Sequence, residues 1–368
     1  MSVNGEQEKI MQQKADGMNY APKGKAQPVC GKGEFPVGVI GLEHGHIYGM
    51  CNGLSEAGAE IELVYDSDPE KVQKFIAAFP QVRPARTKEE ILTSSRIKLV
   101  AGAAVPDQRA GLGIEVMEHG KDYFTDKAPC TTLEQIDACR AKVRETGKKY
   151  AVYYSERLHV EAAVFAEKLI ADGAIGRVVQ VVNLAPHRAN IHQRPDWFFN
   201  KKHYAGIIVD LGCHQIEQFL FYSGSKTATL QSSQTANYKF KQYPDFDDFG
   251  AASFIGDSGA TCYMRVDWLT PNGLGAWGDG RCFIMGTDGY IELRKYIDVA
   301  RSKEGDMVYL VDHKGEQAYC AAGQAGFPFF GCLIRDCLER TNIAYDQDVF
   351  FNAIELAVIA QNEAVRVE

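Results

Sequence analysis

The sequence lacks the features that mark membrane, nucleic-acid-binding and exported proteins. No apolar run in the 368 residues approaches the length that crosses a bilayer. Acidic residues outnumber basic ones by 48 to 40, and the net charge of -8 argues against a nucleic-acid partner, because phosphate binding relies on a basic surface. The first residues are polar and lack the apolar core of a signal peptide. We therefore predict a cytoplasmic protein with neither a membrane nor a nucleic-acid partner.

The ten cysteines form no CxxC pair, and their spacing is irregular. Irregular spacing of this kind gives neither a disulfide framework nor a zinc ligand set. We expect reduced, mostly buried thiols. The histidines that crowd one later loop fit no common metal motif either, so the prediction for metals is none.

The length of the chain favours two domains, because single cores rarely grow this large. Residues 1–34 show no periodicity and are interpreted as a flexible arm or an extension that contacts another subunit. In residues 35–156, apolar strands alternate with helices, which predicts a doubly wound parallel sheet. In residues 157–368, polar and apolar residues alternate between Gly and Asp turns, which predicts a large and mainly antiparallel sheet with one open face. The fold class is therefore α/β throughout.

The ligand of a parallel sheet lies at the carboxyl ends of its strands. Gly41 closes the first expected strand, where a dinucleotide-binding chain would read Gly-x-Gly-x-x-Gly. The same frame here reads Gly41, Glu43 and His46, and Gly45 stands one residue early. This fingerprint alone is a weak signal. A carboxylate facing a pyrophosphate is unfavourable, so we expect Glu43 to point away from it or toward the nicotinamide.

Asp66 strengthens the case for a dinucleotide. It ends the second expected strand, 25 residues after Gly41, where an acid can bind the ribose hydroxyls of adenosine. A carboxylate there would repel a 2′-phosphate, so NAD is favoured over NADP. The alternative is a turn acid or helix cap before Pro69. His44 and His46 could contact the phosphate or the nicotinamide, or cap the helix that begins there.

Two places in the chain could supply chemistry. Lys127 follows the fourth expected strand of the parallel sheet, at its ligand-binding edge. Asp210 and His214 are four residues apart in an expected helix and share one face, which Glu217 continues. An imidazole beside a carboxylate carries protons near neutral pH. The alternative is an aspartate in the first turn of the helix with a surface histidine.

Two motifs occur in an informative order. The segment DKAP at Asp126–Pro129 is similar to a Glu-Lys-Pro loop, with Asp in place of Glu and one inserted residue. The later segment matches Asp-x-Gly-x-His-x-x-Asp at Asp210, Gly212 and His214, with Glu217 in place of the last acid. Both motifs, together with EKLIADGAIGRVVQV and FIMGTDGYIEL, resemble those of the glucose–fructose oxidoreductase and inositol dehydrogenase family (Gfo/Idh/MocA).

The resemblance implies an NAD-binding Rossmann domain over residues 35–156, followed by a substrate-binding and oligomerisation domain. It implies that Lys127 reaches between the nicotinamide ribose and the reacting hydroxyl, that His214 takes the hydroxyl proton, and that Asp210 orients the imidazole. The third-strand motif departs from the usual Thr-Pro-Asn-x-x-His and reads VPDQRA from Val105. The expected cofactor-binding residues are Gly41, Glu43, His44, His46, Asp66, Pro106, Asp126 and Lys127.

Polar and aromatic side chains near the second domain are candidates for substrate binding. A loop from Ala185 to Gly206 carries three histidines, two arginines and Trp197. Sugars bind to hydrogen-bonding groups and an aromatic face, and this loop offers both. The alternative is a solvated or subunit-facing loop. The expected substrate-binding residues are Arg157, His159, His187, Arg194, Trp197 and His214.

The expected activity is hydride transfer between NAD and a ring hydroxyl of a sugar, glycoside or cyclitol. One alternative enzyme would hold NAD tightly and cleave glycosides through oxidation, elimination and reduction. A second alternative is a regulator that binds the dinucleotide without turnover, and the joint presence of Lys127, Asp210 and His214 argues against it. The open face of the second sheet predicts a homodimer or homotetramer.

Overall fold

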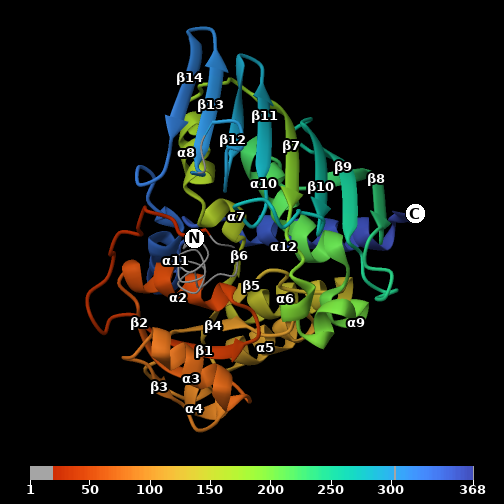
Figure 1. The fold of residues 1–368 in the computed structure, drawn as a ribbon. Coiled ribbons are helices and arrows are strands. Elements are labelled where there is room, and N and C mark those ends of the chain that lie inside the picture. The colour runs from red at the N-terminus through yellow and green to blue at the C-terminus, as the bar shows by residue number, and fades with distance from the viewer. Residues whose placement is uncertain (1–19, 302–303, 368) are drawn as a thin grey trace, which may run out of the picture.

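The computed structural model describes residues 20–301 and 304–367. Its N-terminal half holds a parallel sheet with the strand order β3-β2-β1-β4-β5-β6, which confirms the predicted doubly wound sheet (Figure 1). The short β3, which pairs with β2, was not predicted. The strands are β1 (Pro36–Leu42), β2 (Glu60–Tyr65), β3 (Arg83–Pro84), β4 (Leu99–Ala103), β5 (Asp122–Asp126) and β6 (Tyr150–Tyr153).

The helices of this half begin and end at residues that favour helix termini. The carboxylate of Asp68 accepts the N–H of Glu70 at the start of α3, and Thr132 accepts the N–H of Gln135 at the start of α6. Gly147 ends α6 in the left-handed conformation. The helices are α2 (His46–Glu56), α3 (Pro69–Ala78), α4 (Lys88–Leu92), α5 (Pro106–Glu118) and α6 (Leu133–Thr146).

The second half is built on a nine-stranded sheet in the order β14-β13-β12-β11-β7-β10-β9-β8-β15. Only the β7–β10 and β8–β15 pairs are parallel within the described residues, so the prediction of a mainly antiparallel sheet is confirmed. The polar strand β8 was missed. The strands are β7 (Val178–Pro186), β8 (Ala228–Ala236), β9 (Phe249–Gly256), β10 (Thr261–Asp267), β11 (Arg281–Gly286), β12 (Gly289–Arg294), β13 (Met307–Asp312), β14 (Gly315–Cys320) and β15 (Val365–Arg366).

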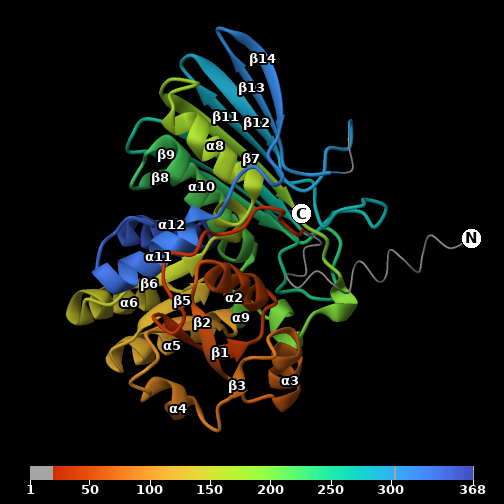
Figure 2. The ribbon, with the colours of Figure 1, turned by 90° about the vertical axis from the view of Figure 1, so that its left-hand side faces the viewer.

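Helices α8 (Glu161–Ala171) and α10 (Cys213–Ser223) cover one face of this sheet, and no helix of the described residues lies on the other face (Figures 1 and 2). Four large apolar side chains are more than a third exposed and alternate with buried residues along neighbouring strands, which places them on the uncovered face. These residues are Ile255, Tyr263, Met285 and Tyr290.

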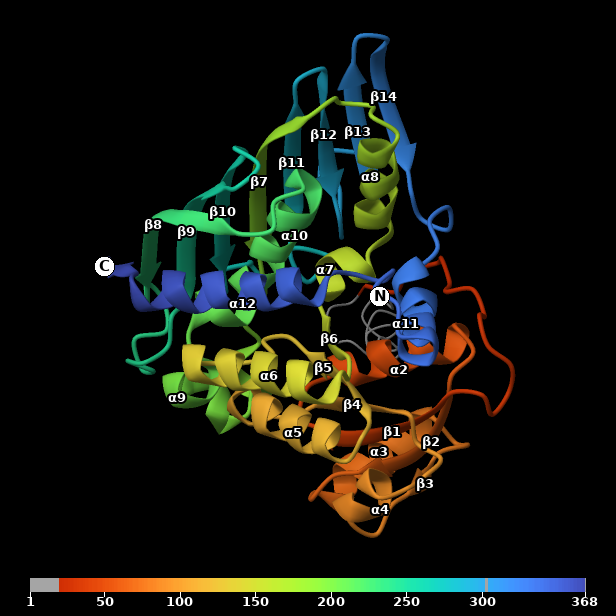
Figure 3. The same ribbon diagram turned by 180° about the vertical axis from the view of Figure 1, so that it is seen from behind.

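The last long helix, α12, lies between the two sheets (Figure 3). It contacts α10 and β8 of the second half and α6 and β6 of the first half. The α12 side chains Asn352 and Glu355 both bind Arg140 of α6. The remaining helices are α7 (Ser155–Leu158), α8 (Glu161–Ala171), α9 (Lys201–Tyr204), α10 (Cys213–Ser223), α11 (Pro328–Glu339) and α12 (Gln347–Asn362), with short 3₁₀ turns at Ile191–Gln193 and Asp196–Phe199 and a π-helical turn at Ile208–Gly212.

Residues 20–34, here called the N-terminal strap, differ from the predicted flexible arm, while residues 1–19 lie outside the described chain. Two backbone N–H groups of the strap donate to the buried carboxylate of Glu161, at 2.6 and 2.8 Å. The Tyr20 hydroxyl donates to Asp306 at 2.9 Å, and another strap N–H bonds the Ala57 carbonyl. The strap is therefore fixed to both halves of the molecule.

Two expectations from composition can be compared with the structure. All ten cysteines are free thiols, and most are buried, as predicted. In residues 20–301 and 304–367, we find no helix with both the length and the apolar character needed to cross a membrane.

Candidate active site

A cavity of about 230 Å³ lies between the carboxyl ends of the parallel strands and the second half of the chain. One side, here called the cofactor wall, is formed by Glu43, His44, Gly45, His46, Pro106, Arg109 and Lys127. The other side, here called the substrate wall, is formed by His187, Asn190, Gln193, Arg194, Pro195, Trp197, Phe198, Asp210, Leu211, His214, Trp268 and Trp277.

The turn after β1 suits a dinucleotide. Gly41, the second-last residue of β1, has φ +87°, and a Cβ there would lie 3.1 Å from the Ala104 Cβ and 3.2 Å from the Ala104 backbone, so the position favours glycine. Asp66 accepts the N–H of Leu42 at 2.7 Å and thereby fixes this turn against the end of β2. The glycine near the end of β1, the start of α2 and the acid after β2 together fit NAD. The role of Asp66 toward ribose stays a prediction.

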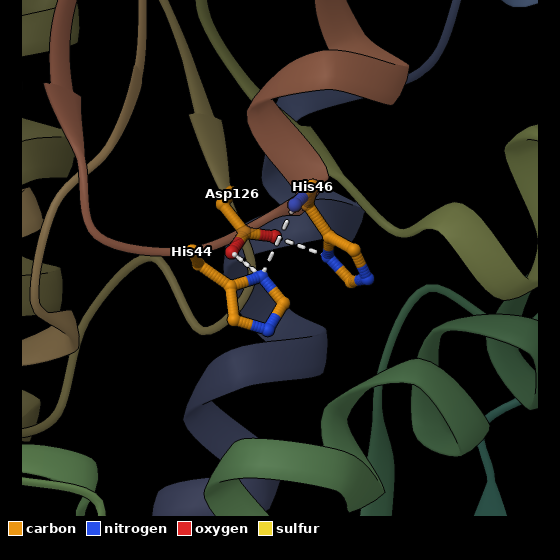
Figure 4. A group of neighbouring side chains, drawn as sticks. All are labelled: His44, His46 and Asp126. Carbon is orange, nitrogen blue, oxygen red and sulfur yellow. Dashed lines mark hydrogen bonds and ion pairs between the residues drawn. The ribbon is translucent and has the colours of Figure 1, made fainter. Parts of the chain in front are cut away.

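Asp126, at the end of β5, organises the cofactor wall (Figure 4). Its two carboxylate oxygens lie 3.0 Å from Nδ1 of His44 and 2.8 Å from Nδ1 of His46. Arg109 binds the same carboxylate at 3.1 Å. Burial alone would raise the pKa of Asp126, but His46 and Arg109 hold the pKa well below its usual value. The backbone N–H of Lys127 also donates to it at 2.7 Å, so Asp126 is a buried carboxylate with four nitrogen partners.

Arg109 was not predicted as a site residue. Its guanidinium is buried, donates to the backbone carbonyls of Lys127 and Ala128, and so holds the loop that presents the Lys127 side chain. Only one sequence signal could have found it, a charged residue on the otherwise small and apolar buried face of α5.

The ligand atoms of His44, His46 and Asp126 lie within 4.8 Å of one another, a spacing that could hold a metal ion. The Asp126 oxygen that faces His44 also binds the Arg109 guanidinium. That cation already compensates the carboxylate and would repel a second one. We interpret the group as a hydrogen-bonded network, and the prediction of no metal stays a prediction.

Lys127 and Asp210 meet inside the cavity. Lys127 Nζ lies 2.8 Å from Asp210 Oδ1 and 2.9 Å from the Asp210 carbonyl oxygen. Burial would lower the pKa of Lys127, but the carboxylates of Asp210 and Asp126 raise it above its usual value. Burial would likewise raise the pKa of Asp210, and Lys127 lowers it. The two groups form a buried ion pair contributed by both halves.

His214 also lines the cavity, but it does not bind Asp210 as expected. The side chain of Asp210 is bonded to Lys127, and Nδ1 of His214 is buried without a hydrogen-bond partner. The reason is local, because Ile208–Gly212 is a π-helical turn and the four-residue spacing of an α-helix does not hold across it. Burial lowers the pKa of His214 well below its usual value. The imidazole is therefore neutral at neutral pH, and the same burial weakens it as a base.

Two residues expected to bind substrate, Arg157 and His159, lie outside the cavity lining. Arg157 and Glu217 form a buried ion pair with Nε–O distances of 2.8 and 2.9 Å, and the Arg157 guanidinium stacks on Phe221. The short helix α7 turns Arg157 toward α8. His159 binds the Tyr153 hydroxyl, and burial lowers its pKa to about 3. The structure does not bring these side chains to a substrate.

The predicted loop does reach the cavity through His187, Arg194 and Trp197. His187 bonds the Ala185 carbonyl at 3.0 Å, and burial lowers its pKa. Trp197 Nε1 donates to Glu43 at 3.3 Å. Glu43 in turn pairs with Lys71 of α3, so its carboxylate is neutralised beside the expected position of the pyrophosphate.

Sequence reasoning missed other parts of the substrate wall. Trp268 and Trp277 arrive from the loop after β10, far along the chain from the predicted loop. Glu156 is fully buried behind the wall, where it accepts from Gln215 at 3.0 Å and lies 3.2 Å from the Lys295 ammonium. Two of the three tryptophans of the chain lie close together after one expected strand, and this was the one available signal.

Comparison with known proteins agrees with this architecture. Residues 35–154 match the model of an oxidoreductase family with an NAD-binding Rossmann fold, and residues 164–292 match the GFO/IDH/MocA C-terminal domain. The two matches together define a two-domain oxidoreductase that binds NAD. The chain belongs to the Gfo/Idh/MocA family and is a dehydrogenase.

Individual relatives span nearly the whole chain. Scyllo-inositol 2-dehydrogenase (NAD(+)) of Bacillus subtilis (strain 168) is 25% identical over 334 residues, covering 88% of this chain and 92% of the relative. A putative oxidoreductase from Erwinia carotovora atroseptica SCRI1043 is 48% identical, with a TM-score of 0.88 over 91% of this chain and 100% of that chain. Aldose-aldose oxidoreductase from Caulobacter crescentus, complexed with glycerol, shares the fold at 16% identity, with a TM-score of 0.73 over 90% of this chain and 97% of that chain.

Proposed function

We propose that this dehydrogenase oxidises a hydroxyl group on a sugar or cyclitol. The observation that carries the proposal is the convergence of Lys127, Asp210 and His214 in one cavity at the ends of the parallel strands. The names of relatives, an inositol dehydrogenase and a D-xylose dehydrogenase among them, support this substrate class.

The residues of the cavity divide the work. Bound NAD supplies the acceptor for the hydride that leaves the substrate carbon. Lys127 donates hydrogen bonds to the substrate oxygen and stabilises the negative charge that develops there. His214, neutral because of its burial, accepts the hydroxyl proton. Asp210 holds the Lys127 ammonium charged and in place, rather than orienting the imidazole.

Replacement of Lys127 tests this division. We expect Lys127→Ala to lower kcat about 10²–10³-fold on a substrate that the wild type oxidises, since one preorganised donor contributes about that much. NADH formation measures turnover, and quenching of protein fluorescence by NADH measures cofactor binding, which should persist. Because Lys127→Ala leaves Asp210 buried without its partner, the double variant Lys127→Met/Asp210→Asn serves as a second form. Activity equal to that of the wild type in either form contradicts the proposal.

We further propose that the chain forms a homodimer or homotetramer through the uncovered face of the nine-stranded sheet. The exposed residues Ile255, Tyr263, Met285 and Tyr290 support this, since apolar side chains gathered on one face favour association. Light scattering of the purified chain should give a mass of two or four subunits, and introduction of Tyr263→Lys and Met285→Lys should shift it toward one. A monomeric wild type contradicts the proposal.

A further inference from the structure

Three donor groups of the substrate wall are buried without an acceptor. They are Nη2 of Arg194 and the indole Nε1 atoms of Trp268 and Trp277. Arginine and tryptophan side chains donate hydrogen bonds and accept none. A buried donor without a partner costs stability, so such groups gather where a ligand completes them. All three residues line the one cavity described above.

The guanidinium of Arg194 is held by one hydrogen bond and by three surrounding aromatic rings. Its Nε donates to the Ala189 carbonyl at 2.9 Å. Its carbon lies 4.5 Å from the ring centre of Phe198, 4.9 Å from that of Trp268 and 5.4 Å from that of Trp277. Aromatic rings stabilise the cation but accept no hydrogen bond in its plane. Nη2 of Arg194 has no hydrogen-bond partner within the protein, so an acceptor group on a ligand in the cavity would supply the missing bond.

The charge of Arg194 also lacks a paired carboxylate. The cavity lining, as far as the chain is described, contains two carboxylates, and both already have cationic partners: Asp210 binds Lys127, and Glu43 binds Lys71. The carboxylate of Asp210 attracts Arg194 from a distance, while Lys127 competes for it directly. The substrate wall thus presents one uncompensated positive charge and two further donors.

We propose that the substrate is a polyhydroxy acid, a sugar or cyclitol derivative whose carboxylate binds the edge of Arg194 beside the indoles of Trp268 and Trp277. This rests on the proposed function and narrows it. A planar carboxylate accepts two parallel bonds from a guanidinium, whereas a neutral hydroxyl would leave the charge uncompensated. The carboxylate takes no part in the redox step, in which the hydroxyl carbon gives up a hydride to NAD and the hydroxyl proton goes to His214.

Matched substrate pairs provide the test, with D-glucose against D-glucuronate and D-galactose against D-galacturonate, and NADH formation as the readout. We expect the acid of at least one pair to have a kcat/KM at least about 10-fold above its neutral partner. Arg194→Met should lower kcat/KM for that acid about 100-fold, mainly through KM, since hydrogen bonds to charged groups are worth about that factor. Lys202→Met, an exposed charge removed from the same segment, should leave both values unchanged.

Several outcomes would overturn the proposal. Equal kcat/KM values for the neutral sugar and the acid would show that the site does not select a carboxylate. An equal loss of kcat/KM for both members of a pair in Arg194→Met would make Arg194 structural. A stronger preference for D-glucose 6-phosphate than for any carboxylate would assign the site to phosphate esters instead.

Calorimetric titration of the enzyme–NAD complex separates this proposal from the proposed function. If D-glucuronate or D-galacturonate binds the wild type but not Arg194→Met, and no NADH forms, the inference stands and the oxidation of these substrates fails. If neutral sugars reduce NAD and neither acid binds, the inference fails and the proposed function stands.

Discussion

The two walls of the cavity differ in how their charges are satisfied. On the cofactor wall, the carboxylate of Asp126 has three side-chain nitrogen partners and one backbone N–H partner, and Glu43 pairs with Lys71. On the substrate wall, Arg194 and two indoles bury donors that find no acceptor in the protein. Both walls are polar, so composition does not distinguish them. The difference is that the charges of the cofactor wall are paired within the protein, whereas the Arg194 cation of the substrate wall has no paired carboxylate.

This difference implies that the cofactor wall is rigid and that the substrate wall recognises the ligand. A wall whose buried groups are all paired resists movement, because breaking one pair leaves an uncompensated charge behind. A wall with unpaired donors gains the missing bonds when an acceptor-rich ligand arrives. Substitutions on the cofactor wall should therefore affect folding first, and those on the substrate wall should affect binding first.

The largest contrast should appear in stability. Asp126→Ala removes the carboxylate shared by His44, His46 and Arg109, and we expect it to lower the free energy of unfolding by about 3–5 kcal/mol, the usual cost of stranding a buried charge. Arg194→Met should change it by less than about 1 kcal/mol, because the cation that it removes has no paired carboxylate. Urea unfolding of both variants measures this. Equal losses would mean that the walls do not differ.

If Asp126→Ala does not fold, Asp126→Asn offers a milder form of the same experiment. Its amide keeps one acceptor for Arg109 or a histidine and removes the charge. We expect Asp126→Asn to lose more stability than Arg194→Met and less than Asp126→Ala, each measured against the wild type.

A smaller contrast should appear in pH dependence. Burial, and then the neighbouring His46, lower the pKa of His44 to about 4, below the value of about 6.5 in an unfolded chain. Between these values the unfolded state binds more protons, so stability falls as the pH falls. His44→Asn keeps a donor for Asp126 but cannot be protonated, and should lose about 1–2 kcal/mol less than the wild type between pH 7 and 5.

Arg194→Met is the control for this measurement. The guanidinium that this substitution removes stays charged across the same pH range in the wild type. The variant's loss of stability between pH 7 and 5 should therefore match that of the wild type. An unchanged slope in His44→Asn would show that His44 is not held neutral in the folded protein.

Position along the chain predicted the parts of the site that the parallel sheet dictates. Lys127 and Asp126 follow a strand end, and strand ends of a parallel sheet meet at one edge, so their place followed from the pattern. The partner of Asp210 did not follow, because a π-helical turn is not visible in residue spacing. Arg157 was misplaced because the short helix α7 redirects it toward α8.

The residues that were missed depend on contacts between distant segments. Trp268 and Trp277 reach Arg194 only because β10 pairs with β7 and brings the loops after both strands together. The burial of Arg109 depends on the carbonyl groups of the Lys127 loop, which follow the next strand of the sheet. The periodicity of apolar residues indicates which face of a helix or strand a residue lies on. It does not indicate which distant loop will cover that face.

The N-terminal strap has a consequence for how such a segment can be found in relatives. It binds Glu161 through backbone N–H groups, which every residue except proline possesses, so most of its side chains are free to change. Two exceptions are Tyr20, whose hydroxyl donates to Asp306, and Gly24, where a Cβ would lie 2.0 Å from the Ala325 carbonyl oxygen. The sequence of the N-terminal strap can therefore diverge widely among relatives, while a glycine at a fixed distance before the first strand is retained.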